Sequence, residues 1–342
     1  MPSERPPGGE RRPRLTPAIA DVRRAVREHL GALPSGSLAL VALSGGPDSL
    51  ALAAAAAFEA PRLGRRAGAI VVDHGLQSDS AEVAERAAEQ ARALGLLPVR
   101  VVRVRIDGRG GPEGAARAAR YAALEEAAAE LDASAVLLGH SLDDQAETVL
   151  LGLARGSGTA SLSGMAAIAG LYRRPFLGLR RAVLARACAD AALEPWHDPH
   201  NEQERFARVR VRRSILPMLE SELDAGVTEA LARTAEIARE DAEALDQMVD
   251  EVAEELVELE EGGCSVPAAW LAANPAALRH RLIRLVARAE FGVSLSRAQT
   301  LEVARLAIGW HGQKAVHLPG IRVERTAGRI VFTAAPPTPR GD

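Results

Sequence analysis

The segment SGGPDS, residues 44–49, places small and polar residues between two apolar runs. It consists of Ser44, Gly45, Gly46, Pro47, Asp48 and Ser49. The two glycines allow backbone conformations that other residues avoid, so their N–H groups can point at one anion. The two serines add hydroxyl donors, and a helix that follows would present its positive N-terminal end. We therefore expect a phosphate-binding loop, with a simple capped turn as the alternative.

The spacing of this loop differs from two common nucleotide motifs. It has no lysine and does not fit GxxxxGK[ST], and it does not fit the GxGxxG pattern of dinucleotide-binding folds either.

A second cluster, LLGHSLDDQAETVLL, begins at Leu137. Its polar members are Gly139, His140, Asp143, Asp144, Glu147 and Thr148. The helix dipole favours carboxylates near a helix start, but this explains only some of them. Carboxylates grouped at a strand end indicate a Mg²⁺ site or a contact to a cationic substrate. We expect Asp48 and Asp144 to bind the metal, although which acid binds metal and which binds substrate stays open.

Three further stretches carry polar residues at informative spacings. Asp73 and His74 follow the apolar run IVV at the end of an expected strand. The alternative to a functional role is that they are only a strand-end carboxylate and a solvated histidine. The segment PEGAARAARYAAL has four polar side chains three or four positions apart, so they can lie on one face of a helix. These side chains are Glu113, Arg117, Arg120 and Tyr121. The alternative is an ordinary surface helix with a Glu–Arg pair.

The run RFARVRVRR, residues 205–213, contains five arginines in nine positions. Arg208 and Arg212 are four apart and share a helical face. Such a run repels itself unless anions are near, which favours phosphate binding over a solvated face. The net charge of −3 gives no sign of a globally basic nucleic-acid binder.

Apolar strands alternate with helices through the first two thirds of the chain. We expect strands at residues 38–43, 68–73, 99–106 and 135–139, and helices at 16–30, 48–60, 80–94, 113–131 and 142–153. This order predicts an α/β fold with a doubly wound, mostly parallel sheet. Ligands of such sheets bind at the carboxyl ends of the strands, where the polar motifs fall.

The remaining chain predicts a smaller helical domain. Residues 227–259 read as a long helix, two helices follow near 275–289 and 296–308, and a β-hairpin turns at 326–328. We expect a disordered tail at 1–14, a catalytic domain at 15–220 and a helical domain with the hairpin at 225–335. The absence of a long apolar run, of a signal peptide and of a CxxC pair predicts a cytoplasmic protein without a membrane span.

Five ordered motifs across residues 38–220 resemble one enzyme superfamily. SGGPDS resembles the pyrophosphate-binding loop of the N-type ATP pyrophosphatases, and residues 113–121 resemble their ExxARxxRY helix. DHGLQ resembles their DHxLR motif, with Gln77 in place of the arginine. GHSLDDQAET with RGSG, and the stretch from Asp198 to Leu219, resemble the tRNA(Ile)-lysidine synthase family. His200 and Val209 depart from its usual DxSN…FxRNRxR pattern.

This resemblance implies ATP and Mg²⁺ as cofactors, and free L-lysine and the CAU-anticodon tRNA(Ile) as partners. ATP would adenylate the wobble cytidine and release pyrophosphate, and lysine would displace AMP. The modified tRNA would read AUA instead of AUG. A homodimer is also implied, and the helical domain would bind tRNA.

The resemblance also implies roles for individual residues. Asp143, Arg117 and Arg208 would act in catalysis. ATP would contact Ser44–Ser49, Asp73, His74, Gly139 and His140. The substrates would contact Glu113, Arg120, Tyr121, Asp144, Glu147, Thr148, Arg210 and Arg212.

Two alternatives remain. Another pyrophosphatase-type enzyme, such as a tRNA thiolase or an amide-forming synthetase, would share the loop, but the chain lacks a CxxC pair and an obvious glutaminase domain. A catalytically silent tRNA-binding protein could keep the fold, although the intact SGGPDS and DDQAET motifs argue against it.

Overall fold

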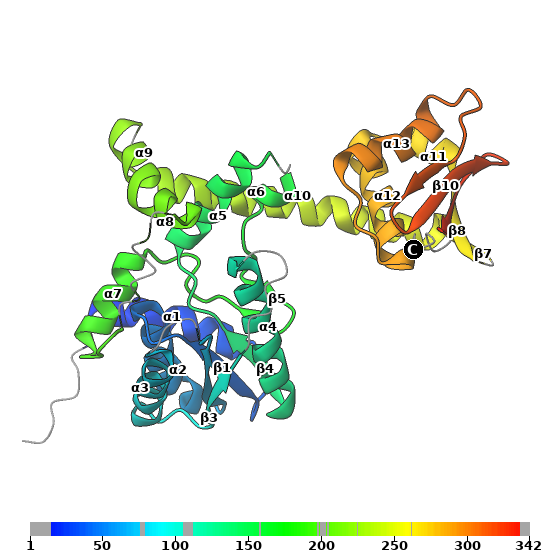
Figure 1. Cartoon of the computed structure of the whole chain (residues 1–342). Coiled ribbons are helices and arrows are strands. Elements are labelled where there is room, and N and C mark those ends of the chain that lie inside the picture. Colours follow the sequence, from blue (N-terminus) through cyan, green and yellow to red (C-terminus); the bar gives the residue numbers. More distant parts are fainter. Residues whose placement is uncertain are drawn as a thin grey trace, which may run out of the picture. The chain divides into compact units, whose positions relative to one another are not determined.

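The computed structural model describes residues 15–75, 79–104, 112–156, 159–196, 198, 203, 205–223, 225–260 and 262–335, without the side chains of 112, 113, 159 and 160. The expected disordered tail and Gln77 lie outside these ranges, as does the side chain of Glu113. Contacts divide the chain into two compact units, Met1–Ala238 and Arg239–Asp342 (Figure 1). This division falls inside a helix, and the domain boundary expected at residues 220–226 stays a prediction.

The first unit begins with a regular alternation of helices and strands. Its elements are α1 (Pro17–Gly31), β1 (Leu38–Leu43), α2 (Pro47–Arg62), β2 (Arg66–Asp73), α3 (Ser80–Ala93), β3 (Val99–Arg103), α4 (Pro112–Glu130), β4 (Ala133–Leu137) and α5 (Leu142–Ala154). All nine were predicted from the sequence. Thr16 caps α1 by accepting a hydrogen bond from Ile19 N at 3.3 Å.

Shorter elements follow that the sequence did not predict. They are α6 (Thr159–Leu162), β5 (Ile168–Ala169), β6 (Tyr172–Arg173), α7 (Arg181–Asp190), α8 (Ala207–Arg210), the π-helical turn η2 (Val211–Ile215) and α9 (Leu216–Glu222), before α10 (Val227–Leu256). The π-helical turn falls within the arginine run, and such turns are frequent at functional sites.

The first sheet has the strand order β3-β2-β1-β4-β6-β5. Its neighbours pair in parallel except for β5, which pairs antiparallel with β6. Leu43, the last residue of β1, pairs with Val71 of β2. The carboxyl ends of these two strands therefore place Ser44 and Asp73 at the same edge of the sheet.

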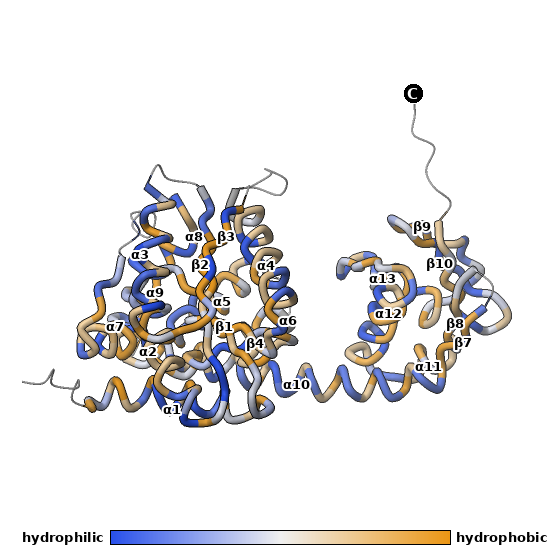
Figure 2. The backbone as a smooth tube through the Cα atoms, turned by 90° about the horizontal axis from the view of Figure 1, so that it is seen from below, coloured by the Kyte–Doolittle hydropathy of each residue, from blue (hydrophilic) through white to orange (hydrophobic). Residues whose placement is uncertain are grey.

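Both faces of this sheet are covered by helices. Ala39, Val41 and Leu43 lie in one core cluster with residues of α1, α2, α3 and α7, whereas Leu40 and Ala42 lie in a second cluster with residues of α4. The side chains of a strand alternate between faces, so a continuous apolar run indicates two covered faces. The central strands are hydrophobic along their length in Figure 2. The predicted doubly wound, mostly parallel fold is confirmed.

The second unit combines helices with a five-stranded antiparallel sheet. Its elements after α10 are β7 (Glu258–Glu260), β8 (Gly263–Pro267), α11 (Ala268–Ala273), α12 (Ala276–Phe291), α13 (Arg297–Ile308), β9 (Val316–Leu318), β10 (Ile321–Thr326) and β11 (Arg329–Ala334). The predicted hairpin is present as β10 and β11, joined through Thr326 and Arg329, within the strand order β7-β8-β11-β10-β9.

The C-terminal end predicted for the helix at residues 227–259 is wrong. Helix α10 stops at Leu256, and Glu258–Glu260 instead pairs antiparallel with Gly263–Pro267. Cys264 and Val266 of β8 are buried in the core of this unit, so the strand pairing is fixed by tertiary packing that helical periodicity does not reveal. No helix among the described residues is long and apolar enough to cross a membrane.

Candidate active site

The SGGPDS segment forms a self-supported turn between β1 and α2. Ser49 lies at its centre: its Oγ accepts a hydrogen bond from Ser44 N at 3.1 Å, donates one to Gly46 O at 3.0 Å, and lies 3.1 Å from Ser44 Oγ. Gly45 has a φ of +80°, a conformation that favours glycine. The Ser49 hydroxyl thus links Ser44 and Gly46 across the loop.

The N-terminus of α2 opens toward this loop without a capping side chain. Gly46 is the N-cap residue, and Pro47 occupies the first turn. Gly139 packs directly against this turn, because a Cβ atom there would lie 3.2 Å from Asp48 O and 3.3 Å from Ser49 N. An uncapped helix start with a positive dipole is suited to an anion.

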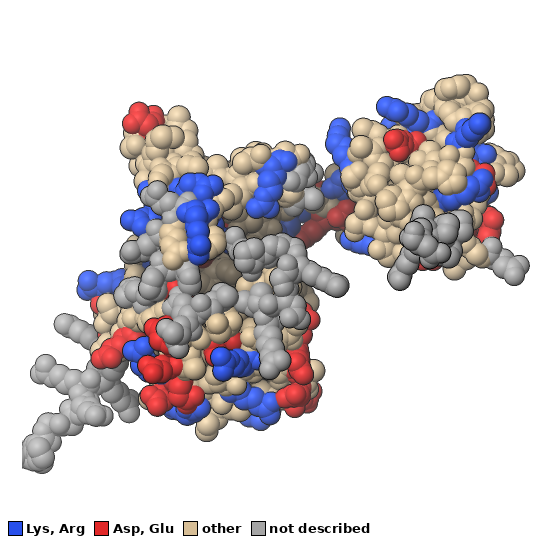
Figure 3. Space-filling model, viewed as in Figure 1, with Lys and Arg blue, Asp and Glu red and all other residues tan. Residues whose placement is uncertain are grey.

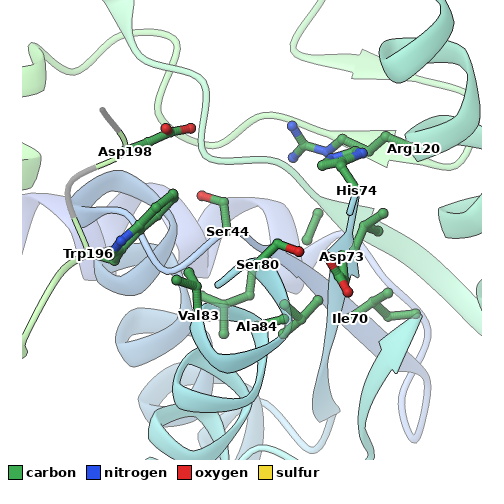
Figure 4. A pocket seen from close by; sticks show the side chains of 14 residues that line it. Ser44, Ile70, Asp73, His74, Ser80, Val83, Ala84, Arg120, Trp196 and Asp198 are labelled. Atoms are coloured by element: carbon green, nitrogen blue, oxygen red, sulfur yellow. The ribbon is translucent and has the colours of Figure 1, made fainter. Parts of the chain in front are cut away.

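A cavity of about 250 Å³ adjoins the loop at the ends of β1 and β2 (Figure 4). Its walls are Ala42, Leu43, Ser44, Ile70, Val71, Val72, Asp73, His74, Ser80, Val83, Ala84, Arg120, Trp196 and Asp198. Apolar walls with a few convergent polar groups are typical of small-molecule sites. Three predicted ATP contacts therefore line the same cavity: Ser44, Asp73 and His74.

The polar side of this cavity carries unused hydrogen-bonding groups. Arg120 has no hydrogen-bond or ion-pair partner within the described ranges, and burial lowers its pKa. Burial and the nearby Arg120 lower the pKa of His74, whose buried Nδ1 has no partner within the same ranges. The carboxylate of Asp73 has partners of its own, because it accepts a hydrogen bond from Gly75 N at 2.9 Å and lies 3.7 Å from Arg103 Nε. A guanidinium without a partner in a pocket is suited to an anionic ligand.

Asp48 within the loop and His140 next to Gly139 are buried ionisable groups. Burial, offset in part by Arg181, raises the pKa of Asp48 to about 6, and its buried Oδ1 has no partner among the described residues. Burial lowers the pKa of His140 to about 3, and its Nδ1 is likewise buried without a described partner. An orphaned carboxylate oxygen beside a phosphate-binding loop fits a Mg²⁺ ion. No group of three or more possible metal ligands occurs among the described residues.

Helix α5 begins with a capping box that fixes Asp144. Its Oδ2 accepts hydrogen bonds from Ser141 N at 2.8 Å and from Ser141 Oγ at 2.7 Å. Its Oδ1 faces Arg181 Nη2 at 2.8 Å. Asp144, predicted to bind metal and substrate, thus already has its oxygens engaged by the protein, and its metal role stays a prediction.

Glu147 is fully buried and is paired with three arginines. Arg212 Nε lies 2.7 Å from its carboxylate, Arg208 Nε 2.9 Å and Arg181 Nη2 3.1 Å. Arg208 also donates to Thr148 Oγ1 at 2.9 Å, and that hydroxyl donates to Asp144 O. A buried carboxylate requires such compensation. The network joins α5, α7, α8 and the π-helical turn η2.

A second cavity, of about 260 Å³, lies beside this network. It is lined by Asp143, Glu147, Arg180, Arg181, Arg212, Leu216, Pro217, Glu220 and Thr228. Asp143 accepts the Arg181 N–H at 2.7 Å and lies 3.3 Å from Arg180 Nη2. The cavity thus presents acidic and basic side chains together, as the recognition of an amino acid would require.

The arginine run divides into two sets. Arg208 and Arg212 share a face, as their spacing predicted, and both pair with Glu147, whereas Arg205, Arg210 and Arg213 are exposed. Figure 3 shows basic side chains gathered over the part of the unit that contains α8. The exposed set is suited to polyanion binding.

Arg117 and Tyr121 lie away from the cavity lining. Arg117 is exposed and lies with its guanidinium 5.0 Å from the centre of the Tyr121 ring. Tyr121 packs edge-on against Tyr172, with ring centres 4.9 Å apart. The structure therefore brings Arg120 rather than Arg117 to the cavity, and a catalytic role of Arg117 stays a prediction.

Sequence reasoning missed three residues of this site. Arg180 and Arg181 contact the predicted acids from the start of α7, and Trp196 lines the cavity. The stretch RRPFLGLRR, residues 173–181, ends in these two arginines and was a usable signal for them. No local pattern marked the tryptophan.

Two family models match the chain. A PP-loop domain matches residues 20–219, and a TilS substrate binding domain matches residues 267–331. The chain is 62% identical to a tRNA(Ile)-lysidine synthase of Leifsonia xyli over 88% of this chain and 91% of that protein. The chain belongs to the tRNA(Ile)-lysidine synthase family. A relative with the same name from Thermobifida fusca is 51% identical over 93% of this chain and 98% of that protein.

A solved structure supports the fold of the first unit. The tRNA thiolase NcsA of Methanococcus maripaludis, solved with its [4Fe-4S] cluster, superposes with a TM-score of 0.54 at 19% identity. The match covers 64% of this chain and 78% of that one. At this identity the likeness concerns the fold alone. The family models and the two named relatives confirm the predicted family, its PP-loop ATP-using domain and its enzyme class as a lysidine synthase.

Proposed function

We propose that this enzyme uses ATP and free L-lysine to convert the wobble cytidine of the CAU-anticodon tRNA(Ile) to lysidine, so that the tRNA reads AUA instead of AUG. The observation that carries the proposal is the continuity of the cavity with the phosphate-binding loop. Ser44 belongs to the loop and also lines the cavity, so a nucleotide can place its base in one and its phosphates on the other.

In the first step the O2 atom of the cytidine attacks the α-phosphorus of ATP. An O–P bond forms, the bond to the β-phosphate oxygen breaks, and pyrophosphate leaves. Positioning and charge stabilisation dominate such a transfer. The loop and the α2 N-terminus hold the leaving phosphates, and Arg120 faces the anion from the opposite wall. Asp48 would hold a Mg²⁺ ion, which would neutralise part of the phosphate charge.

In the second step the lysine amine attacks C2 of the adenylated base. A C–N bond forms, the C–O bond breaks, AMP leaves, and the amine loses a proton. Asp143 is the acid proposed to hold the ammonium group and then accept this proton, because it lines the cavity of mixed charge beside α5. Arg180 and Arg212 in the same cavity are suited to the lysine carboxylate.

A tRNA requires a larger contact surface than the two cavities provide. Exposed Arg205, Arg210 and Arg213 supply positive charge in the first unit. The second unit carries the match to a substrate binding domain, and we propose that it contacts the tRNA. A homodimer and a cytoplasmic location stay predictions.

The test measures pyrophosphate release and incorporation of labelled lysine with purified protein. Lysine, tRNA(Ile) and tRNA(Met) are each added or omitted. We expect pyrophosphate release that needs tRNA(Ile), and label in that tRNA alone. Label in another acceptor, or no release with any acceptor, would overturn the proposal.

The variant Asp143→Asn separates the two steps. We expect it to retain tRNA-dependent pyrophosphate release and to lose most lysine incorporation. Glu229→Gln is the matched control, because Glu229 also pairs with Arg180 but does not line the cavity. Unimpaired incorporation in Asp143→Asn would remove Asp143 from the mechanism.

A further inference from the structure

Trp196 is joined to the phosphate-binding loop through its backbone. Its N–H donates a hydrogen bond to Gly45 O at 2.9 Å. The segment that precedes it is tied to α3, because Gln90 Nε2 donates to Glu194 O at 3.1 Å. The tryptophan therefore sits between α3 and the loop, far in sequence from both.

The glycines of the loop leave room for this contact. A Cβ atom on Gly45 would lie 3.4 Å from Ala87 Cβ and 3.8 Å from Trp196 Cβ, and one on Gly46 would lie 3.9 Å from Trp196 O. Gly45 therefore lies between Ala87 of α3 and Trp196, and a cavity of about 230 Å³ adjoins all three residues. A change in the position of either partner is transmitted to the other.

The half-buried indole of Trp196 forms one wall of the cavity at the ends of β1 and β2. Figure 4 places it across the cavity from His74 and Arg120, with Ser44 and Ser80 between the two sides. The neighbouring wall is apolar and includes Val83 and Ala84. Aromatic rings in such walls pack against planar ligands, and every nucleobase has a face for this contact.

We propose that Trp196 is the residue that couples the filling of this cavity to the shape of the phosphate-binding loop. Its indole packs against the adenosine part of ATP, and its N–H holds Gly45 in the conformation that receives the phosphates. The inference rests on the proposed function, because it takes ATP as the ligand. It assigns Trp196 a positioning role that no sequence motif indicated.

Tryptophan fluorescence tests the indole contact. The chain has three tryptophans, and Trp270 and Trp310 lie in the second unit. We expect ATP to change the emission of the wild type and of Trp310→Phe saturably, and to leave the emission of Trp196→Phe unchanged. Equilibrium dialysis with labelled ATP measures binding independently of the fluorescence.

The positioning role predicts a loss of affinity with little loss of maximal rate. We expect Trp196→Phe to raise the Kd and KM for ATP about threefold and Trp196→Ala more than tenfold, with kcat for lysine incorporation kept within about twofold. Both substitutions keep the backbone N–H, and circular dichroism checks that the fold is retained.

The outcomes separate this inference from the proposed function. Absence of ATP binding to the wild type in dialysis would overturn both. ATP binding with an unchanged Kd in Trp196→Ala, or a full fluorescence response in Trp196→Phe, would overturn the role of Trp196 alone.

Discussion

The guanidinium of Arg181 lies 3.7 Å from the carboxylate of Asp48, although the two residues belong to different helices on the sheet. The same side chain pairs with Asp144 at 2.8 Å and with Glu147 at 3.1 Å. One arginine thus connects the start of α2, which carries the phosphate-binding loop, to the acidic face of α5. The charge of the nucleotide site and that of the second cavity are therefore balanced by a shared network.

Removal of the buried carboxylate at Glu147 will destabilise the first unit. Glu147→Gln leaves Arg181, Arg208 and Arg212 close together without their common counter-ion. We expect a loss of about 3–5 kcal/mol in the free energy of unfolding, measured by urea denaturation. Glu229→Gln, at a partly exposed pair with Arg180, should cost less than about 1 kcal/mol. Equal effects of the two variants would contradict the central role of Glu147.

Asp48→Asn will stabilise the free protein at neutral pH while weakening nucleotide binding. Burial raises the pKa of Asp48 to about 6, so the native state binds more protons than the unfolded state between pH 3.8 and 6. The free energy of unfolding therefore falls as pH rises through this window. We expect the variant to gain about 2–3 kcal/mol at pH 8 and little at pH 4, measured in metal-free buffer. A destabilised variant at pH 8 would contradict the assignment.

His140 gives the opposite pH dependence. Burial lowers its pKa to about 3, so the unfolded state binds more protons between pH 3 and 6.5, and stability falls as pH falls through that window. Protonation of the unfolded state should cost about 3 kcal/mol at pH 4 relative to pH 7. We expect the stability of His140→Asn to fall less than that of the wild type between pH 7 and pH 4, because the variant lacks this titrating group. Thermal unfolding of both proteins at the two pH values will measure the difference. Parallel pH profiles would show that His140 is not responsible.

Arg120 and Arg117 will differ in their effect on ATP binding. Arg120→Ala removes a guanidinium that lines the cavity, and we expect the Kd for ATP to rise about tenfold or more. Arg117→Ala removes an exposed side chain that lies against Tyr121, and the Kd should change by less than about threefold. Isothermal titration calorimetry measures both. A catalytic role of Arg117 would appear in kcat instead, and an effect of Arg117 on the Kd larger than that of Arg120 would reverse the assignment.

Gly139 is predicted to tolerate no side chain. A methyl group there would meet the backbone of Asp48 and Ser49 at 3.2–3.3 Å, which neither residue can relieve by a rotamer change. We expect Gly139→Ala to cost about 1–3 kcal/mol of stability and to weaken ATP binding. Gly114→Ala is the control, since nothing lies within 4 Å of its Cβ position in α4 and alanine favours a helix. Unchanged ATP affinity in Gly139→Ala would show that the turn has room to adjust.

The local elements of the first unit followed from the sequence because their signals are local. The turn at Gly45, the capping residue Thr16 and the apolar strands each depend on neighbours within a few positions. The contact of Arg181 with Asp48 and that of Trp196 with Gly45 join segments more than one hundred residues apart, and no periodicity encodes them. The strand at Glu258–Glu260 was missed for a different reason: its partner lies only a few residues further on, but the packing of Cys264 and Val266 in the core fixes the pairing.

Ser49 has a consequence for the thermodynamics of nucleotide binding. Its hydroxyl closes the loop through hydrogen bonds with Ser44 and Gly46, so the entropy of ordering this turn is lost when the protein folds. An incoming triphosphate meets a rigid receptor and mainly exchanges water for fixed donors. Preorganisation of this kind makes the affinity for the phosphates sensitive to the mutation of a hydroxyl that need not touch them.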